Sequence, residues 1–451
     1  MRSIFKYAAM MMALAFCLNG TAQTQTWREM HKVKKKETIF GIAHAYGITE
    51  EELRNANPEM KNEGYMLKKG DYIFIPYHQE ERPAEVKPVV REVNKNADVR
   101  ERPIRVGIML PLHNENGDGL RMVEYYRGVL LALEDLKAAG ISTDVRAWNL
   151  HINADVDKVL LEEGANDRDI IFGPLYTSQM DKMSMFARTF GIKLVVPFSI
   201  EGSHVQENPN IFQVYQRPSE LDALTILRFA ERFAGYNIVI IDCNDSKSTK
   251  GAFTMALREK LGQSKINYNI TNLTSSEQLF AKAFSLEKPN VVVLNTGASP
   301  QLNEAMRKLN VLTAANKSLQ ISLMGYNDWL LYERNFMELF YKYDTFIPTY
   351  YYYNTASTKT KELETRYRAN FGTDMMNNYI PRFALSGYDQ ARFFLRGLHR
   401  DGKTFTGESP DKDALQTQFK FVRQGEGGGM KNKQFMFMHY NRNKTISTIV
   451  Y

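Results

Sequence analysis

The sequence predicts an α/β protein made of a small βααβ module and a larger, two-lobed domain with parallel sheets. Strand and helix patterns alternate through residues 104–451 in two successive series. Repeated β-α units of this length form parallel sheets covered by helices. A compact strand-helix-helix-strand pattern occupies residues 31–76. The charged, proline-containing segment 78–103 lies between the two parts and has the composition of a linker that cannot bury a core.

Residues 1–22 have the pattern of a secretory signal peptide. Basic residues precede an apolar run over residues 8–18, and residues 20–22 are small. The apolar run is too short to span a bilayer. Cys17 leaves open a lipoprotein alternative, which the large side chain of Phe16 disfavours. We therefore expect export to the periplasm or cell envelope, with free release favoured over lipidation.

The remaining composition excludes some functions. Once the signal peptide is removed, Cys243 is the single cysteine, so an intramolecular disulfide cannot form. A buried thiol at a strand end is its expected role. The formal net charge is +7, but the basic residues are scattered, and no helix-turn-helix, finger or RNA-binding signature accompanies them. We expect no nucleic-acid partner, and attraction to an anionic envelope polymer explains the charge equally well.

Local signals predict each element of the small module. Residues 31–35 can form a short strand. Apolar residues then recur at helical spacing from Glu37 to Gly47, which ends the helix as its C-terminal cap. Residues 49–52 form a capping box that opens a second helix, and residues 72–75 alternate as a strand.

This module resembles the LysM family. The resemblance rests on His31-x-Val33-Lys34-Lys35, Thr38-Ile39-x-x-Ile42-Ala43-x-x-Tyr46-Gly47-Ile48, Leu53-x-x-x-Asn57-Pro58 and Leu67-x-x-Gly70-Asp71-x-Ile73-x-Ile75-Pro76. It implies a LysM domain over residues 30–77 that binds N-acetylglucosamine-containing chains of peptidoglycan in a shallow groove. By position, the resemblance assigns the groove to Glu37, Thr38 and Ile39 on one side and to Asn57, Pro58 and Met60 on the other.

One position departs from the family pattern. Lys36-Glu37 stands where the family usually has Gly-Asp, so we expect the tight turn of this loop to be altered. A single repeat is also compatible with a folding spacer, because LysM modules often occur in tandem to gain avidity. Sugar binding is the preferred interpretation.

The larger domain begins with a series of alternating elements. The first series has strands over 106–112, 144–150, 169–172, 194–198 and 211–214, and helices over 120–139, 155–163 and 178–190. The second has strands over 237–241, 291–294 and 320–324, and helices over 250–261 and 301–309. An aromatic strand over 346–353, helices over 358–370 and 388–400, and a closing hairpin of 419–423 with 434–440 complete the prediction.

This order of elements resembles the type I periplasmic binding protein fold of the Leu/Ile/Val-binding proteins. The matching motifs are Ile108-Met109-Leu110-Pro111-Leu112, Gly173-Pro174-Leu175-x-x-Ser178 and Val195-Val196-Pro197-Phe198-Ser199. The resemblance implies a ligand between the lobes, at the C-terminal ends of the strands. By position, the cleft residues are Tyr176, Thr177, Ser178, Phe198, Ser199, Tyr215, Asp242, Tyr326, Asn327 and Tyr350.

Several of these residues also have a structural explanation. Ser178 can cap its helix, residues 350–353 can form a partly buried strand, and Asp242 can terminate a strand. The amino-acid binders of the family commonly have Tyr-Gly after the Asp242 strand, whereas this chain has Ser-Thr-Lys-Gly at 248–251. An amino-acid ligand therefore does not follow from the resemblance.

The sequence lacks the motifs of an enzyme. No metal-binding histidine spacing, Gly-x-Ser-x-Gly elbow or phosphate loop occurs. The Ser-x-x-Lys match at residues 409–412 is explained by helix capping, and the acid pairs at 50–52 and 162–163 lie on short or solvated helical faces. We expect no catalysis, cofactor or metal.

Together these observations predict a non-catalytic cell-envelope protein. A LysM domain anchors it to peptidoglycan, and the two-lobed domain binds a small ligand such as an amino acid or peptide, or an envelope protein partner. Two alternatives remain open: the solute-binding component of an amino-acid ABC transporter, and a scaffold resembling the outer-membrane activators of peptidoglycan synthases. A receptor needs an acid such as Asp242 facing the cleft, whereas a scaffold can fill the cleft with Tyr and Phe.

Overall fold

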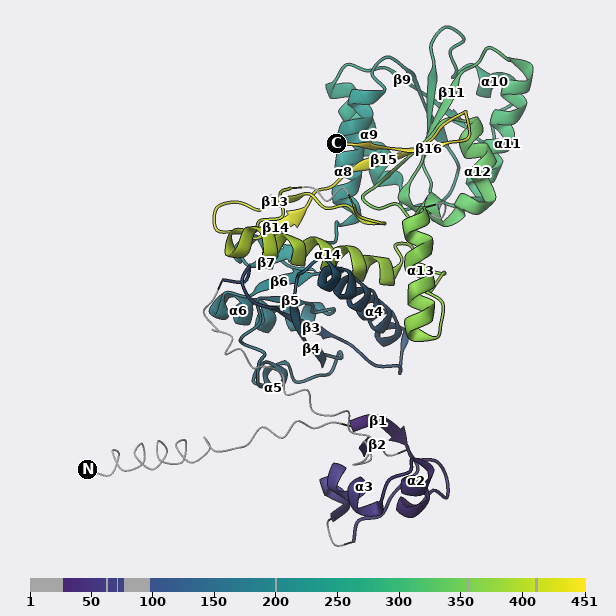
Figure 1. Ribbon diagram of the computed structural model, residues 1–451. Coiled ribbons are helices and arrows are strands. Elements are labelled where there is room, and N and C mark those ends of the chain that lie inside the picture. The colour runs from purple at the N-terminus through teal and green to yellow at the C-terminus, as the bar shows by residue number, and fades with distance from the viewer. Residues whose placement is uncertain are drawn as a thin grey trace. The chain divides into compact units, whose positions relative to one another are not determined.

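The computed structural model describes residues 27–61, 64–70, 72–76, 98–198, 201–354, 357–409 and 413–451. The chain divides into two compact units, Met1–Asn94 and Lys95–Tyr451 (Figure 1). Outside the described residues lie the predicted signal peptide with Cys17, most of the predicted linker, the cleft residue Ser199 and residues 410–412 of the Ser-x-x-Lys segment.

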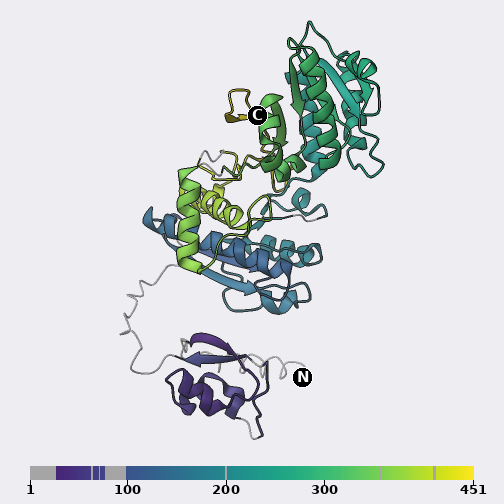
Figure 2. The same ribbon diagram turned by 90° about the vertical axis from the view of Figure 1, so that its right-hand side faces the viewer.

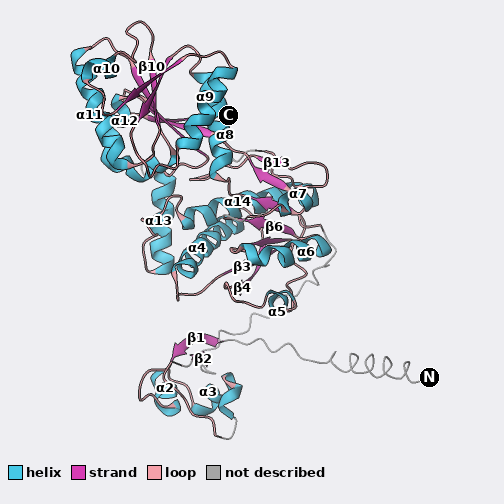
Figure 3. Ribbon diagram, turned by 180° about the vertical axis from the view of Figure 1, so that it is seen from behind, coloured by secondary structure: helices cyan, strands magenta, loops and turns pink. Residues whose placement is uncertain are grey.

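The smaller unit has the predicted βααβ order (Figure 3). Its elements are β1 (Trp27–Lys32), α2 (Ile39–Ala45), α3 (Glu50–Ala56), the 3-10 helix η1 (Pro58–Lys61) and β2 (Tyr72–Pro76). The two strands pair antiparallel, with His31 opposite Ile73. The helices pack on a core of Val33, Ile42, Ala43, Ile48, Leu53, Met60, Ile73 and Ile75.

The caps explain where these elements begin and end. The expected strand over 31–35 is wrong at both bounds, because β1 begins at Trp27 and the chain leaves it after Lys32 to enter a turn. Thr38 has an extended backbone and caps α2, so the helix begins at Ile39 rather than at Glu37. The predicted capping box at Thr49 is confirmed, since both of its reciprocal hydrogen bonds are present.

The first lobe of the larger unit is built on a seven-stranded sheet of order β13-β14-β7-β6-β5-β3-β4, parallel except for the edge strand β13. Its strands are β3 (Ile104–Leu110), β4 (Thr143–Asn149), β5 (Ile170–Phe172), β6 (Lys193–Val196), β7 (Ile211–Gln213), β13 (Phe421–Arg423) and β14 (Met430–Asn432). Its helices are α4 (Gly117–Ala138), α5 (Val156–Leu160), η3 (Thr177–Gln179), α6 (Met180–Phe190), α7 (His204–Glu207), α13 (Thr358–Phe371), α14 (Phe383–Asp401) and η5 (Gly402–Thr404).

Helices α4 and α14 lie side by side on this sheet although they are far apart in the sequence (Figures 1 and 2). Two glycines permit the close approach. A Cβ atom on Gly128 would lie 1.8 Å from the carbonyl oxygen of Ala384, and one on Gly387 would lie 2.0 Å from that of Tyr125. The two backbones therefore touch directly, and any larger side chain at either glycine would push the helices apart.

The second lobe is built on a sheet of order β16-β15-β12-β11-β10-β8-β9. Its strands are β8 (Asn237–Asp242), β9 (Tyr268–Asn272), β10 (Asn290–Leu294), β11 (Ile321–Met324), β12 (Thr345–Thr349), β15 (Met436–Tyr440) and β16 (Ile446–Val450). Its helices are α8 (Pro218–Arg232), α9 (Gly251–Gln263), α10 (Glu277–Ala281), α11 (Ser299–Ala315), η4 (Asn327–Tyr332) and α12 (Glu333–Lys342). Strands β9, β8, β10, β11 and β12 run parallel in the sheet. Strands β15 and β16 pair antiparallel at its other edge.

The chain passes between the lobes after β7, after β12 and after β14. This path corrects the predicted closing hairpin. Strand β13 pairs with β14, whereas residues 436–440 form β15 and pair with β12 and β16 in the other lobe. The physical reason is burial, because Phe435 and Phe437 complete the aromatic core of the second lobe.

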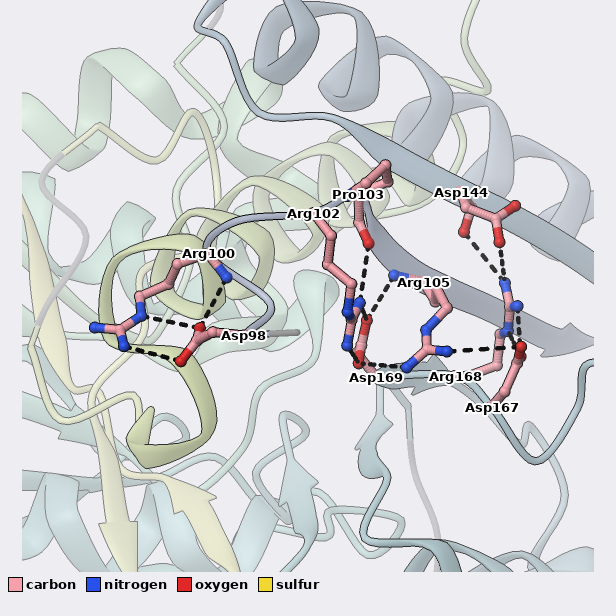
Figure 4. A network of polar contacts seen from close by, with 9 residues as sticks. All are labelled: Asp98, Arg100, Arg102, Pro103, Arg105, Asp144, Asp167, Arg168 and Asp169. Carbon is pink, nitrogen blue, oxygen red and sulfur yellow. Dashed lines mark hydrogen bonds and ion pairs between the residues drawn. The ribbon is translucent and has the colours of Figure 1, made fainter. Parts of the chain in front are cut away.

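A network of arginines and aspartates holds the start of the larger unit (Figure 4). Arg102 donates to both carboxylate oxygens of Asp169 at 2.7 Å, and the backbone N–H of Arg105 donates to Asp169 Oδ2 at 2.7 Å. Arg168, whose side chain is 1% exposed, pairs with Asp144 and Asp167. The last residues of the predicted linker, Asp98 to Pro103, are thus part of the larger folded unit.

Candidate functional site

The loop between β1 and α2 forms the first wall of the predicted glycan groove. Lys36 adopts a left-handed backbone conformation, with φ of 70°. A residue with a side chain pays roughly 1 kcal/mol for this conformation, which glycine adopts freely. The loop therefore turns tightly although Lys36 stands where the family usually has glycine, and the left-handed backbone of Lys36 costs conformational free energy.

Glu37, one of the predicted groove residues, holds this loop together. Its Oε2 atom accepts the backbone N–H of Lys34 at 2.7 Å and lies 2.8 Å from His31 Nε2. His31 Nδ1 lies 2.9 Å from the hydroxyl of Tyr46, the C-cap residue of α2. The hydrogen bond from Lys34 and the contact with His31 lower the pKa of Glu37. The carboxylate thus ties β1, the loop and the end of α2 to each other.

The neighbouring groove residues have mixed exposure. Thr38 is exposed, and its Oγ1 accepts the backbone N–H of Gly41 at 3.0 Å as the helix cap. Ile39 is half-buried against the core and presents part of its apolar surface. Phe40, the next residue, is 65% exposed and stacks on His44. This wall combines a polar cap with exposed apolar surface, which suits the hydroxyls and the faces of a sugar.

The predicted opposite wall is the turn after α3. The side chain of Asn57 is fully buried and donates from Nδ2 to the carbonyl of Leu53 at 2.8 Å. Met60 is also buried, and its carbonyl accepts a hydrogen bond from Arg54 Nη1 at 3.0 Å. Pro58 lies in η1, and its side chain is outside the described part of the chain. The side chains of Asn57 and Met60 therefore shape this turn from within.

In the first lobe of the larger unit, Tyr176 belongs to a polar cluster at the C-terminal ends of the strands. Its hydroxyl donates to Asp118 Oδ2 at 3.1 Å, and Asp118 also pairs with Arg121. Burial and then the hydrogen bond to Asp118 raise the pKa of Tyr176 to about 12. Arg121 lies over the rings of Tyr379 and Phe383, at 5.5 and 5.9 Å from their centroids. Opposite charges thus stand beside aromatic rings.

The other predicted residues of this lobe separate into exposed and buried ones. Thr177 and Ser178 are exposed in η3. The cap interpretation of Ser178 is wrong, because α6 begins only at Met180 and Gln179 occupies its N-cap position. Phe198 is half-buried, contacts the rings of Tyr125 and Phe383, and packs against the core of the lobe.

Tyrosines gather where the chain passes between the lobes. Tyr350 and Tyr351 are 8% and 5% exposed, and their rings meet edge to face. Burial is the main cause that raises the pKa of both, and Tyr215 lies close enough to raise both further. The Tyr351 hydroxyl interacts with the Asn327 side chain, whose Oδ1 atom is buried without a hydrogen-bond partner among the described residues. The structure thus brings three predicted residues, Tyr215, Asn327 and Tyr350, together.

A charged cluster of the second lobe surrounds the predicted residue Tyr326. Tyr326 is buried, and its hydroxyl donates to the carbonyl of Leu294. Lys250 Nζ lies 5.0 Å from the centre of the Tyr326 ring and 2.7 Å from Asp328 Oδ2. Burial raises the pKa of the half-buried Asp222, and Asp328 raises it further, while Lys250 opposes them.

Asp242 terminates its strand. Its Oδ1 atom accepts hydrogen bonds from the backbone N–H of Asn244 at 3.0 Å and from Asn295 Nδ2 at 2.9 Å. The next residue, Cys243, is buried as expected, and burial raises the pKa of its thiol to about 12. Asp242 therefore organises the strand end, and the thiol of Cys243 is kept protonated.

Five charged residues at these edges were not predicted: Asp118, Arg121, Asp222, Lys250 and Asp328. Asp118 follows β3 in the first turn of α4, and Lys250 directly precedes α9 after β8. Both positions obey the rule that ligands of open α/β sheets bind beyond the carboxyl ends of the strands. This rule was the one signal in the sequence that could have identified these residues. Nothing in the local sequence distinguishes them from ordinary charged surface residues.

Within the described part of the chain, no group of three or more His, Cys, Asp and Glu residues is arranged to hold a metal ion. No described helix is long and apolar enough to cross a bilayer.

Comparison with known proteins supports both halves of the architecture. The LysM domain model matches residues 31–76. No curated protein matches the sequence. A solved structure from Rhodospirillum rubrum, described as a branched-chain amino acid ABC transporter, is 15% identical, covers 77% of this chain and 100% of its own, and has a TM-score of 0.50.

A second solved structure, LpoA from Haemophilus influenzae, is 13% identical, covers 78% of this chain and 59% of its own, and has a TM-score of 0.49. At these identities the likeness concerns the fold alone, and that inference rests on the Rhodospirillum rubrum structure. Residues 31–76 are therefore a LysM domain, and the larger unit has the two-lobed fold of the type I periplasmic binding proteins.

Proposed function

We propose that this chain is a non-catalytic, extracytoplasmic envelope protein that binds peptidoglycan through its LysM domain and a further partner through its two-lobed domain. The LysM match over residues 31–76, together with the buried core of this domain, supports the proposal. Glu37, Thr38 and Ile39 form one side of the glycan site. The turn at Asn57, Pro58 and Met60 forms the other.

Cosedimentation of the mature chain with purified, insoluble peptidoglycan tests the glycan site. Soluble N-acetylglucosamine oligosaccharides should compete for binding. Ile39→Ala removes part of the apolar floor and should weaken binding roughly five- to tenfold, the loss expected for one or two buried methylenes. Asn55→Ala, at an exposed position on α3, is the matched control and should bind like the parent. Binding that resists competition and is insensitive to Ile39→Ala would contradict the proposal.

For the two-lobed domain, the tyrosine cluster favours a protein partner over a transported solute. Tyr350 and Tyr351 are buried against other side chains of the protein. The Asp242 carboxylate accepts hydrogen bonds that organise the end of its strand. A receptor for an amino acid needs an acid for the ammonium group, and the Oδ1 atom of Asp242 already accepts hydrogen bonds from Asn244 and Asn295. The large domain then acts as a scaffold that presents a surface, while LysM holds it at the wall.

A small zwitterionic ligand is the second candidate, because Asp118 and Arg121 place opposite charges beside Tyr176. A thermal-shift screen of the full chain with amino acids, muropeptides and small peptides separates the two. A ligand at a hundred times its dissociation constant adds about 2.7 kcal/mol of stability. A rise in melting temperature that disappears in both Arg121→Met and Tyr176→Phe would establish that the domain is a receptor for a small ligand. A cooperative transition that no compound shifts would favour the scaffold function instead.

A further inference from the structure

Exposed lysines gather on two turns at one end of the LysM domain. Lys34, Lys35 and Lys36 follow β1, and Lys68 and Lys69 precede β2. The two turns are joined by a hydrogen bond from the backbone N–H of Gly70 to the carbonyl of Val33, at 2.8 Å. Antiparallel pairing of β1 with β2 keeps them side by side. We call these five residues the lysine patch.

Four lysines of the patch form no ion pair with a carboxylate of the described residues. No described carboxylate lies within ion-pairing distance of the ammonium groups of Lys34, Lys35, Lys36 or Lys69. The nearby Glu37 carboxylate is engaged by the His31 ring and by the backbone N–H of Lys34. Like charges held together on a small domain repel each other, so an anion that bridges them relieves this repulsion.

The patch is continuous with the glycan groove. Lys36 directly precedes Glu37, Thr38 and Ile39, the first wall of the groove. On the opposite wall, η1 ends at Lys61, which is also exposed. A glycan chain in the groove would therefore carry its substituents past lysine side chains.

The chemistry of the glycan identifies the anion. Chitin and peptidoglycan both contain N-acetylglucosamine, but chitin is neutral. In peptidoglycan, alternate sugars carry a stem peptide with free carboxylates. We propose that the lysine patch binds the stem-peptide carboxylates and so makes the LysM domain prefer peptide-bearing peptidoglycan over neutral N-acetylglucosamine polymers. This inference rests on the proposed function and adds its ligand class.

The experiment compares cosedimentation of the mature full chain with peptidoglycan, with chitin, with peptidoglycan whose carboxylates have been converted to amides, and with vesicles of anionic phospholipid. The test variant is the triple substitution Lys34→Gln, Lys35→Gln and Lys69→Gln, which leaves the groove residues and Lys36 intact. The control is Lys137→Gln, Lys288→Gln and Lys317→Gln, three exposed lysines of the larger unit that give the same change in net charge.

The test variant should bind peptidoglycan roughly five- to tenfold more weakly than the parent at low salt, as expected for the loss of three exposed ion pairs. It should bind chitin and amidated peptidoglycan like the parent. Raising the salt concentration should erase the difference, because exposed charges are screened. The control triple should behave like the parent in every assay.

Three results would overturn the inference. These are an equal loss on peptidoglycan and chitin, no loss on either, or a loss confined to vesicles of anionic phospholipid, which would assign the patch to the membrane surface. Failure of the parent to bind both peptidoglycan and chitin would instead contradict the proposed function. The two failures are therefore distinguishable.

Discussion

The LysM domain and the two-lobed domain place their candidate sites by different means. In the LysM domain, the contacts that shape the first wall join residues close in sequence, with separations of 6 for His31 and Glu37 and 15 for His31 and Tyr46. In the larger domain, Tyr176 meets Asp118 across 58 residues, and Tyr125 bonds Gln390 across 265. A site built from short-range turns tolerates changes elsewhere in the fold. A site built from long-range contacts depends on the whole assembly.

The largest expected effect is on the segment before β13, where Thr417 forms an isolated bridge with Tyr351 after β12. The Asp389 carboxylate is 1% exposed and accepts the backbone N–H groups of Leu415, Gln416 and Thr417, each at 2.8 Å. Asp389→Ala leaves these donors buried without a partner and should cost about 4 kcal/mol of unfolding free energy. Urea denaturation followed by tryptophan fluorescence measures the loss.

The matched control is Asp374→Ala, which removes an exposed ion pair with Arg368 and should change stability little. Far-UV signals from the LysM domain should keep their own transition in the Asp389 variant. If the LysM transition moved with that of the larger domain, the two regions would unfold as one. That result would contradict the distinction drawn between them.

The next effect concerns Asp169 in the Arg102–Arg105 network. Burial raises the pKa of Asp169, but hydrogen bonds from Arg102 and from the Arg105 backbone outweigh burial and hold the pKa below its ordinary value. Stability from this group is therefore present above about pH 4, the usual pKa of an unfolded aspartate, and is lost as pH falls through the lower folded pKa. Asp169→Asn should cost about 2 to 3 kcal/mol at pH 7.

Measuring the unfolding free energies of the parent and of Asp169→Asn between pH 7 and pH 2.5 tests this pH dependence. The difference between the two unfolding free energies should narrow as the pH falls below 4. Asp374→Asn, at an exposed position, should not show this convergence. A gap that stays constant would mean that packing, and not the charge of Asp169, accounts for the loss.

A smaller effect is expected within the LysM domain. Thr49→Ala removes one half of the capping box with Glu52 and should cost about 1 kcal/mol. Thermal unfolding of the LysM transition measures it. Thr49→Ser retains a hydroxyl cap and should keep most of the stability that Thr49→Ala loses. If Thr49→Ala also lowered the transition of the larger domain, the local character of this region would be refuted.

The smallest effect is a gain. Lys36→Gly relieves the left-handed backbone and should stabilise the LysM domain by somewhat less than 1 kcal/mol, because glycine also gains freedom in the unfolded chain. Lys36→Asn, which tolerates this conformation, separates the backbone effect from the lost charge. Lys35→Gly, one residue earlier, removes the same charge but relieves no left-handed backbone, so it should stabilise less than Lys36→Gly. Equal gains at both positions would point to charge repulsion instead.

Much of the architecture followed from short-range patterns. The capping box at Thr49, the end of α2 and the alternating strand β2 could be predicted from a few neighbouring residues. The buried strands β8 and β10 are uninterrupted apolar runs, which parallel sheets covered on both faces require. Strand β9 was missed because only one of its residues, Thr271, is buried, so it has no apolar run to detect.

Pairing and site geometry were harder to predict. Residues 436–440 look like the second strand of a hairpin, yet they pair with β12 because their aromatic neighbours are buried in the other lobe. Thr177 and Ser178 lie in η3, beyond the end of β5. Asp118 and Arg121, which stand beside Tyr176, were not predicted. Charged residues near the start of a helix are common, and only the packing of α4 beside the loop after β5 brings these two next to Tyr176.

The sequence by itself determined the LysM domain, the linker composition and the β-α order of the larger domain. Helical spacing, caps and apolar runs act over a few residues, so they can be seen along the chain. Only the tertiary structure decided that Tyr350 is buried, that Asp242 binds its own strand end, and that two lysine turns form one patch. These outcomes depend on which distant segments pack together, because burial and charge proximity are properties of the assembled fold.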